Sequence, residues 1–251
     1  MRGRALALIL AAALCLSACS AAGEPPAGPS AAASGAPESA DPLGEARERA
    51  RRDMAGAVER ALSALDGHPR GDLGGETEPF DPADTWEGYA DLTEEQRAYL
   101  DAAADYIVEN MPPEASAYDK YRYLACVLSL RADYDYEVRE DRLSETPYGA
   151  LAEGRAVCFG YVYTMQFLCE RADLYCSAVE GVAAWNGEDH GWNLAMLPEG
   201  SYYMDITWCD QYGDIESRGW GEMFMVTEGR MAQDHGDWDG GPATGTVEYW
   251  P

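Results

Sequence analysis

The fold is decided by GRAVCFGY at residues 154–161, EDHGWNL at residues 188–194 and YYMDITW at residues 202–208. Each segment contributes one side chain with catalytic potential: Cys158, His190 and Asp205. Apolar residues follow Cys158 at helical spacing, so the thiol is expected in the first turn of a helix that ends near Arg171. The partial positive charge and free N–H groups of a helix start favour a thiolate.

The histidine and aspartate segments are predicted to lie on neighbouring strands, with strands expected at residues 175–183, 191–197 and 202–207. An even hairpin loop places His190 and Asp205 on the same face of the sheet, because their separation is odd. A loop of residues 196–199 sets them directly opposite, with Cβ atoms about 5 Å apart. A loop centred between Glu199 and Gly200 would separate them by about 13 Å. We expect the first register, in which Asp205 orients the imidazole and leaves its other nitrogen for Cys158.

In this order and spacing, the three segments resemble the cysteine, histidine and aspartate boxes of the transglutaminase-like superfamily of papain-fold enzymes, and the bacterial branch above all. The similarity extends from about Thr93 through RYLACVLSLRADYDYE (residues 122–137) to MFMVTEGRMAQDHGDW (residues 223–238). The resemblance implies a catalytic triad of a nucleophile, a general acid/base and its orienting partner, in the order Cys158, His190 and Asp205.

Two positions depart from the family pattern or stay open. Gly191 stands where the family usually has alanine, and this small-to-small change is expected to matter little. The side chain that completes the oxyanion hole in relatives has no clear match, and Tyr148 is the candidate. His235 lies in a family-like Asp-His pair, for which a structural role near the site is the favoured interpretation.

Metal chemistry is the rival interpretation of these residues. Cys158, His190 and Cys209 could in principle bind zinc, but no Cys-x-x-Cys or His-x-x-x-His spacing is present. The acidic Asp234, Asp237 and Asp239 lack a full calcium loop, so a solvated turn is preferred. We therefore expect no metal and no cofactor.

The N-terminal segment is predicted to be an export signal. Arg2 and Arg4 precede an apolar run and small residues, the order of a secretory signal. Leu16-Ser17-Ala18-Cys19 resembles the lipobox of bacterial lipoproteins, which implies lipidation of Cys19. An ordinary cleaved signal is the alternative. We expect a cell-membrane protein that is held by its lipid and faces outside the cytoplasm.

The remaining chain is predicted to form one α+β domain of transglutaminase-like or papain-like type, with a helical layer against a small antiparallel sheet. A helix over residues 42–67, with Asp41 as its N-cap, carries a mostly alanine stripe and is expected to dock loosely. Helices are also expected from Thr93 and from Ser116. The expected organisation is a signal peptide (1–18), a tether (19–41), an accessory helix (42–67), a linker (68–92), the transglutaminase-like domain (93–240) and a tail (241–251).

Charge and cysteine content narrow the partners. The chain has 18 basic and 45 acidic residues, a formal net charge of −27, which argues against nucleic acid and against anionic lipid surfaces. Five cysteines follow Cys19, and an odd number leaves at least one thiol unpaired within the chain. Whether Cys126, Cys169, Cys176 and Cys209 form bridges is left open.

The predicted reaction is attack of the Cys158 thiolate on a peptide or side-chain amide, giving a thioester. Water would make the protein a peptidase or amidase, which we favour, and an amine would make it a cross-linking transglutaminase. A third reading is a lipid-anchored module that binds peptide or cell-wall fragments without catalysis. The expected substrate is a peptide or protein amide, with cell-wall peptide as one candidate.

Overall fold

The computed structural model describes residues 41–66, 75–137, 141–239 and 241–249. The expected signal peptide, the expected lipidation site Cys19 and most of the tether lie outside these ranges. None of the helices in the described ranges is long and apolar enough to cross a bilayer.

Three long helices form the first layer: α1 (Pro42–Asp66), α2 (Glu94–Glu109) and α3 (Ala117–Arg131). The predicted starts of α2 and α3 are confirmed. Thr93 and Gln96 form a capping box, and the Ser116 hydroxyl accepts a hydrogen bond from the backbone of Asp119. Each cap satisfies a backbone N–H that a helix start would otherwise leave unpaired.

The docking of α1 differs from the expected loose contact. Its alanine stripe, together with Met54 and Val58, is buried and packs against α2 and α3. Small side chains let the helix backbones approach closely, so the stripe forms a tight interface with little apolar volume. Arg122, a side chain of α3 that is 1% exposed, donates a hydrogen bond to the carbonyl of Ala64 on α1.

Short elements connect the helical layer to the central segment. They are the 3-10 turns η1 (Pro82–Asp84), η2 (Glu87–Asp91) and η3 (Leu143–Glu145), the π-helical turn η4 (Gly149–Glu153), and strands β1 (Asp133–Tyr134) and β2 (Arg155–Ala156). β1 and β2 pair in parallel. This pairing holds Tyr134 beside Ala156, two residues before Cys158.

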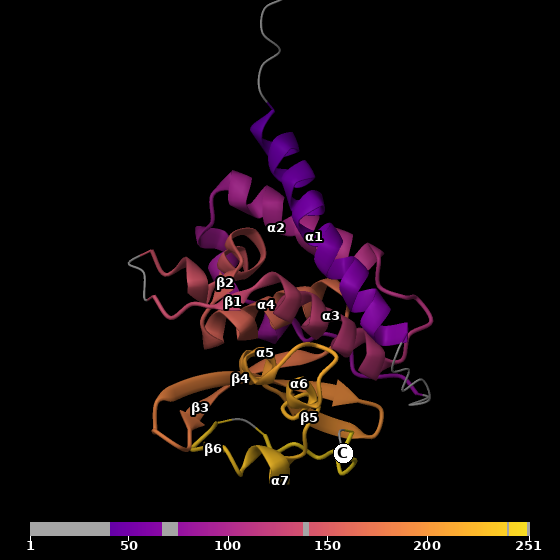
Figure 1. Ribbon diagram of the computed structural model, residues 1–251, viewed down its shortest axis with the longest axis vertical. Coiled ribbons are helices and arrows are strands. Elements are labelled where there is room, and N and C mark those ends of the chain that lie inside the picture. Colours follow the sequence, from indigo (N-terminus) through magenta and orange to yellow (C-terminus); the bar gives the residue numbers. More distant parts are fainter. Residues whose placement is uncertain (1–40, 67–74, 138–140, 240, 250–251) are drawn as a thin grey trace, which may run out of the picture. The chain divides into compact units, whose positions relative to one another are not determined.

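Helix α4 (Cys158–Arg171) begins at the cysteine, as predicted. It packs on an antiparallel sheet of order β5-β4-β3-β6, made of β3 (Cys176–Ala183), β4 (Asp189–Leu197), β5 (Gly200–Met204) and β6 (His235–Gly236). Helices α1 to α4 lie on one side of this sheet, whereas the short helix α7 (Glu228–Met231) lies on the other (Figure 1). The expected α+β arrangement of helices on a small antiparallel sheet is confirmed.

The predicted hairpin register is wrong. Leu197 pairs with Gly200 and Asn193 with Met204, so the loop consists of Pro198 and Glu199. The register is shifted by two residues from the expected one and lies midway between the two alternatives considered. The even loop is retained, because only an even shift keeps the buried faces of both strands buried.

The expected strand at residues 202–207 is also wrong at its end. β5 stops at Met204, and residues 206–212 form the helix α5 (Ile206–Tyr212). The β-branched and aromatic residues Ile206, Thr207 and Trp208 suit a strand, but their tertiary contacts and the cap at Asp205 determine a helix. A further short helix, α6 (Arg218–Gly221), follows.

The five cysteines of the described residues are free thiols. Cys158 is partly exposed, whereas Cys126, Cys169, Cys176 and Cys209 are buried. Burial raises the pKa of the Cys126 thiol to about 12 and raises that of Cys209. These two thiols are therefore held protonated in the core.

Candidate active site

Asp205 is positioned by the junction between β5 and α5. Its backbone N–H donates to the carbonyl of Met223, and its Oδ1 accepts a hydrogen bond of 3.1 Å from the backbone N–H of Trp208. The residue is therefore the N-cap of α5 and is fully buried. Aspartate is a preferred N-cap residue, and a cap holds its carboxylate at a fixed angle to the helix. The sequence does carry this signal, but the strand-like residues around Asp205 obscured it.

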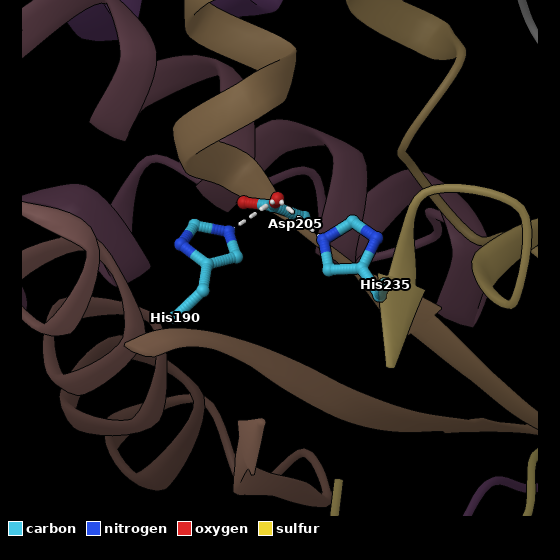
Figure 2. A group of neighbouring side chains, drawn as sticks. All are labelled: His190, Asp205 and His235. Atoms are coloured by element: carbon cyan, nitrogen blue, oxygen red, sulfur yellow. Dashed lines mark hydrogen bonds and ion pairs between the residues drawn. The ribbon is translucent and has the colours of Figure 1, made fainter. Parts of the chain in front are cut away.

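His190 reaches Asp205 from the start of β4. Its Nε2 lies 2.8 Å from Oδ2 of Asp205, and its ring is oriented so that the other nitrogen, Nδ1, lies on the side away from the carboxylate (Figure 2). The predicted pairing of these residues is thus present although the predicted register is wrong. In the observed register His190 and Asp205 are not directly opposite each other. The Asp205 side chain reaches the imidazole from its position as the N-cap of α5.

His235 on β6 occupies the other side of the same carboxylate. Its Nε2 lies 3.2 Å from Oδ2 of Asp205, so one oxygen faces two imidazoles (Figure 2). The His235 ring also packs against Trp192 and Trp208, with centroid distances of 4.6 Å and 4.2 Å. The position of His235 beside the His190–Asp205 pair agrees with the location near the site that the sequence indicated.

The surroundings of Asp205 and His190 favour the charged form of each side chain. Burial acts to raise the pKa of Asp205, but the two histidines outweigh it and lower this pKa to about 2. An ionised carboxylate can only accept hydrogen bonds, so both Nε2 atoms must carry hydrogens. Burial acts to lower the pKa of His190, but the charge and the hydrogen bond of Asp205, together with the influence of Cys158, raise it to about 10. The imidazole is therefore held as an imidazolium at neutral pH.

Cys158 is the first residue of α4, and its influence on His190 is one of the causes of the raised pKa of the imidazole. The helix start is packed closely on the η3 segment. The backbone N–H of Val157 donates to the carbonyl of Ser144, and a Cβ placed on Gly160 would lie 2.1 Å from the same oxygen. Glycine at position 160 is therefore required for this approach.

Two hydrogen bonds fix the three site elements relative to one another. The Tyr161 hydroxyl on α4 donates to Asp210 on α5 at 2.8 Å. The Asn193 side chain on β4 donates to the carbonyl of Val162 on α4 at 3.2 Å. Tyr161 and Asn193 each lie three residues after a candidate catalytic residue, Cys158 and His190 respectively. The two bonds therefore hold α4 against the elements that carry His190 and Asp205.

Tyr148, the oxyanion-hole candidate, makes its contacts elsewhere. Its hydroxyl accepts a hydrogen bond of 3.5 Å from Arg49 on α1, and its ring packs against Tyr99 on α2. Tyr134, by contrast, is near enough to Cys158 for the charge of the thiol to act on it. Burial raises the pKa of Tyr134, and the charges of Cys158 and three further groups add to this effect. The parallel pairing of β1 with β2, which places Tyr134 in this region, was not predicted from the sequence.

A cavity of about 440 Å³ opens beside His190. Its other lining residues come from the start of α4, from β3 and from the segment after β6, and include Phe159, Glu180 and Asp237. The candidate nucleophile, the histidine and an accessible space thus lie in one region, which is the arrangement that a reaction on a bound substrate requires.

The same group also offers ligands of the kind that hold a metal. The ligand atoms of His190, Asp205 and His235 lie within 4.8 Å of one another. Each imidazole already has its Nε2 directed at the carboxylate, so the hydrogen bonds account for the geometry without an ion. The zinc set considered from the sequence included Cys209, which is instead a buried thiol on α5.

Comparison with known proteins gives little further information. No protein-family model matches the chain, and no curated protein matches it. A crystal structure described as that of a TGase aligns with 46% of this chain at 17% identity and a TM-score of 0.41. The aligned part spans 33% of that protein, so this chain covers about a third of its length.

Proposed function

We propose that this protein is a cell-surface thiol enzyme of the transglutaminase-like type that hydrolyses peptide or side-chain amides. Cys158 is the nucleophile, His190 the general acid/base and Asp205 its orienting partner. The observation that carries the proposal is the buried 2.8 Å contact between His190 and Asp205, beside a cysteine at a helix start. The nucleophile on a helix and its partners at strand ends also support a papain-like fold.

The proposed reaction follows from the charges of the site. The imidazolium of His190 stabilises the Cys158 thiolate, which attacks the amide carbonyl carbon to form a C–S bond. His190 then gives its proton to the leaving amine as the C–N bond breaks, and a thioester remains. Water, deprotonated by His190, attacks the thioester and releases the acid and the thiol.

Free N–H groups in the first turn of α4 are the candidates for stabilising the oxyanion, together with a polar side chain such as Tyr134. Asp205 contributes by holding the imidazole in one orientation and tautomer. Its other oxygen is occupied by the backbone of α5, so the carboxylate has no freedom to turn away.

Two alternatives share the same site. An amine in place of water would make the protein a cross-linking transglutaminase, and an inert site would leave a lipid-anchored module that binds peptide or cell-wall fragments. The presence of an accessible cavity at His190 is compatible with all three, whereas the charged His190–Asp205 pair favours chemistry.

Alkylation by iodoacetamide tests the nucleophile. Cys158 should react faster than the four buried cysteines, but exposure alone would produce this order, so the effect of a substitution is the deciding measurement. His190→Ala leaves Cys158 at least as exposed and removes the general base, so it should slow the alkylation of Cys158 at pH 7 by about tenfold or more. An equal or faster rate in His190→Ala would refute the activation of the thiol by the histidine.

Product analysis separates hydrolysis from amine transfer. The full chain is incubated with a glutamine-containing peptide and a fluorescent amine, with Cys158→Ser as the matched control. Release of ammonia without label incorporation supports the amidase, label incorporation supports the transglutaminase, and no turnover above the control supports the binding module.

The lipid anchor is proposed separately from the chemistry. Mass spectrometry of the membrane fraction should detect a mature chain that begins with lipidated Cys19, and Cys19→Ser should release the protein from membranes. An unmodified secreted form of the natural chain would contradict the anchor and would leave the active-site proposal unchanged.

A further inference from the structure

A groove extends from the cavity beside His190 along one edge of β3. Val182 and Glu180 border this cavity, whereas Ala178, two residues earlier on the strand, borders a second cavity of about 400 Å³. The opposite wall comes from α4, where Phe159 lines the first cavity and Tyr163 the second. The Phe159 and Tyr163 rings stack at 5.7 Å, so the two cavities share a wall and form one feature, here called the β3 groove.

The edge of β3 that borders this groove is largely without a partner strand. β6 pairs with β3 only at Val182 and Ala183, and no strand of the described residues pairs with this edge over residues 176–181. The backbone N–H of Ala183 donates to Glu188 on the β4 side. Because backbone groups alternate in direction along a strand, those of Ala178 and Glu180 point away from β4 and toward the open edge.

One bond confirms the direction of this edge. The backbone N–H of Asp239 donates to the carbonyl of Glu180 at 3.1 Å, from the side opposite β4. β6 and the segment after it therefore cover the edge up to Glu180, and the open part extends from there to Ala178, where residues 83–88 form the far side of the cavity. An open edge of this kind is a template for another extended chain.

The lining of the groove is acidic and aromatic. Its carboxylates are Asp84, Glu87, Glu180, Asp189, Asp237 and Asp239. None of the described residues that line the two cavities is a lysine or an arginine. Trp86 stacks on Tyr163 at 6.4 Å and continues the aromatic wall. Carboxylates and aromatic faces together attract lysine and arginine side chains.

We propose that the β3 groove binds the substrate as an extended peptide segment that carries lysine or arginine side chains and adds to β3 as a further strand. The open edge supplies main-chain hydrogen bonds, and the carboxylates supply the preference for cationic side chains. The position of the groove, with His190 at one end, places the bound segment beside Cys158. The inference deepens the proposed function and rests on it for the reaction at Cys158. The binding itself can be measured without any turnover.

Binding is tested first on the full chain with Cys158→Ser, which removes the nucleophile and leaves the groove intact. A short fluorescent peptide with one glutamine and two arginines is compared by anisotropy with the same peptide carrying glutamates in place of the arginines. The arginine peptide should bind at least about tenfold more tightly at low salt, and the difference should shrink as salt is added. Equal affinities would overturn the charge preference.

The strand-like mode has a signature of its own. In an added strand, alternate N–H groups of the peptide point toward β3, so N-methylation should weaken binding at every second position, by about three- to tenfold at each. The positions between them should tolerate the methyl group. Uniform effects along the peptide, or competition by free arginine amide as strong as that of the whole peptide, would overturn the extended mode.

Two substitutions locate the interaction in the groove. Glu180→Gln and Asp237→Asn each remove a charge at nearly constant shape, and asparagine tolerates the left-handed backbone at position 237, where φ is 49°. Each should weaken the arginine peptide about three- to tenfold. Glu114→Gln, an exposed charge between α2 and α3, is the matched control and should have no effect. A control that weakens binding as much as the groove variants would place the interaction elsewhere.

The outcomes separate this inference from the proposed function. Arginine-dependent, position-alternating binding by a protein that shows no amide turnover would refute the enzyme and retain the groove. Turnover of glutamine peptides that is indifferent to arginine, to N-methylation and to the two groove variants would retain the enzyme and refute the groove.

Discussion

The two histidines on Asp205 share one carboxylate oxygen but differ in everything else that surrounds them. His190 borders an open cavity, and Cys158 is among the groups that raise the pKa of its imidazole. His235 is 2% exposed and is enclosed by two tryptophans, and its Nδ1 has no hydrogen-bond partner among the described residues. A catalytic imidazole needs a second nitrogen that can exchange protons with a substrate, and only His190 has one in such a position.

The difference shows how one carboxylate can serve two purposes. Toward His190, Asp205 supplies charge and orientation for a group that reacts. Toward His235, it accepts a hydrogen bond that closes the buried side of the site and helps to keep the carboxylate ionised. The comparison predicts that substitutions on the two sides will separate activity from stability.

His190→Ala should have the largest effect on activity. It removes the group that exchanges protons and stabilises the thiolate, so amide turnover should fall by about 10³-fold or more. The fold should persist, because the side chain borders a cavity and Asp205 keeps its bonds to Trp208 and His235. Steady-state kinetics and thermal unfolding measure both quantities. Retention of more than about a tenth of the activity would remove His190 from the mechanism.

Asp205→Asn should come next and should affect both sides. The amide lacks the charge that raises the pKa of His190 to about 10, so this pKa should fall, because burial is then opposed mainly by the influence of Cys158. Activity should drop by about 10²-fold or more. The pKa is measured by NMR titration of the imidazole, and an unchanged value in the variant would contradict the assigned cause.

The same shifts set a stability window in the natural protein. The stabilisation from His190 is complete below pH 6.5 and is lost as the pH rises through about 10. The stabilisation from Asp205 is complete above pH 3.8 and is lost as the pH falls through about 2. The free energy of unfolding, measured with denaturant across this range, should therefore show a plateau between pH 3.8 and pH 6.5. In Asp205→Asn the loss at high pH should disappear.

The proximity of His190 and Asp205 could be predicted from the sequence better than the path of the chain between them. The helix that begins at Cys158, the capping box at Thr93 and the positions of β3 and β4 all depend on local signals that a sequence carries. The pairing of His190 with Asp205 was also foreseen, but for a partly wrong reason. Parity fixes the shared face of a hairpin, and every even register satisfies it equally.

The rest depended on contacts distant in sequence. The hairpin register is selected by the two-residue loop, which Gly200 follows with a φ of 150°, and by the docking of residues 223–226 along β5. The switch from strand to helix at Asp205 uses the backbone of Met223 and the two histidines. Neither the partner of β5 nor the contact of His235 leaves a periodic signal, so propensity alone extended the strand.

His235 variants test the buried side of the comparison. His235→Phe preserves the aromatic volume but removes the hydrogen bond to a buried carboxylate, so it should lower the free energy of unfolding by about 1–3 kcal/mol. His235→Gln is the matched control, because its amide nitrogen can replace Nε2, and it should recover part of this loss. Turnover should fall less than in Asp205→Asn.

The metal content of the natural protein and of the two His235 variants distinguishes hydrogen bonding from metal coordination by His190, Asp205 and His235. If the group holds an ion, the natural protein should contain a stoichiometric metal that both His235 variants lose, and a chelator should abolish activity. We expect no such metal and no effect of the chelator. A stoichiometric ion in the purified full chain would overturn the hydrogen-bonded assignment of His190, Asp205 and His235.

Gly191→Ala should have the smallest effect and tests the cavity side of the pair. A Cβ at this position would lie 2.9 Å from the ring of Phe159, so even the single methyl group of alanine would make too close a contact unless the ring moved. Phe159 borders the cavity, so its ring can shift, and the cost should stay below about 1 kcal/mol. Gly181→Ala is the matched comparison, since its Cβ would meet the backbone oxygen of Gly236 at 2.9 Å and two tryptophan side chains even closer. That variant should cost about 1–3 kcal/mol in thermal unfolding because a backbone oxygen cannot move aside. Equal costs would mean that Phe159 is held as rigidly as the sheet, and the cavity wall beside His190 would then be preformed rather than adaptable.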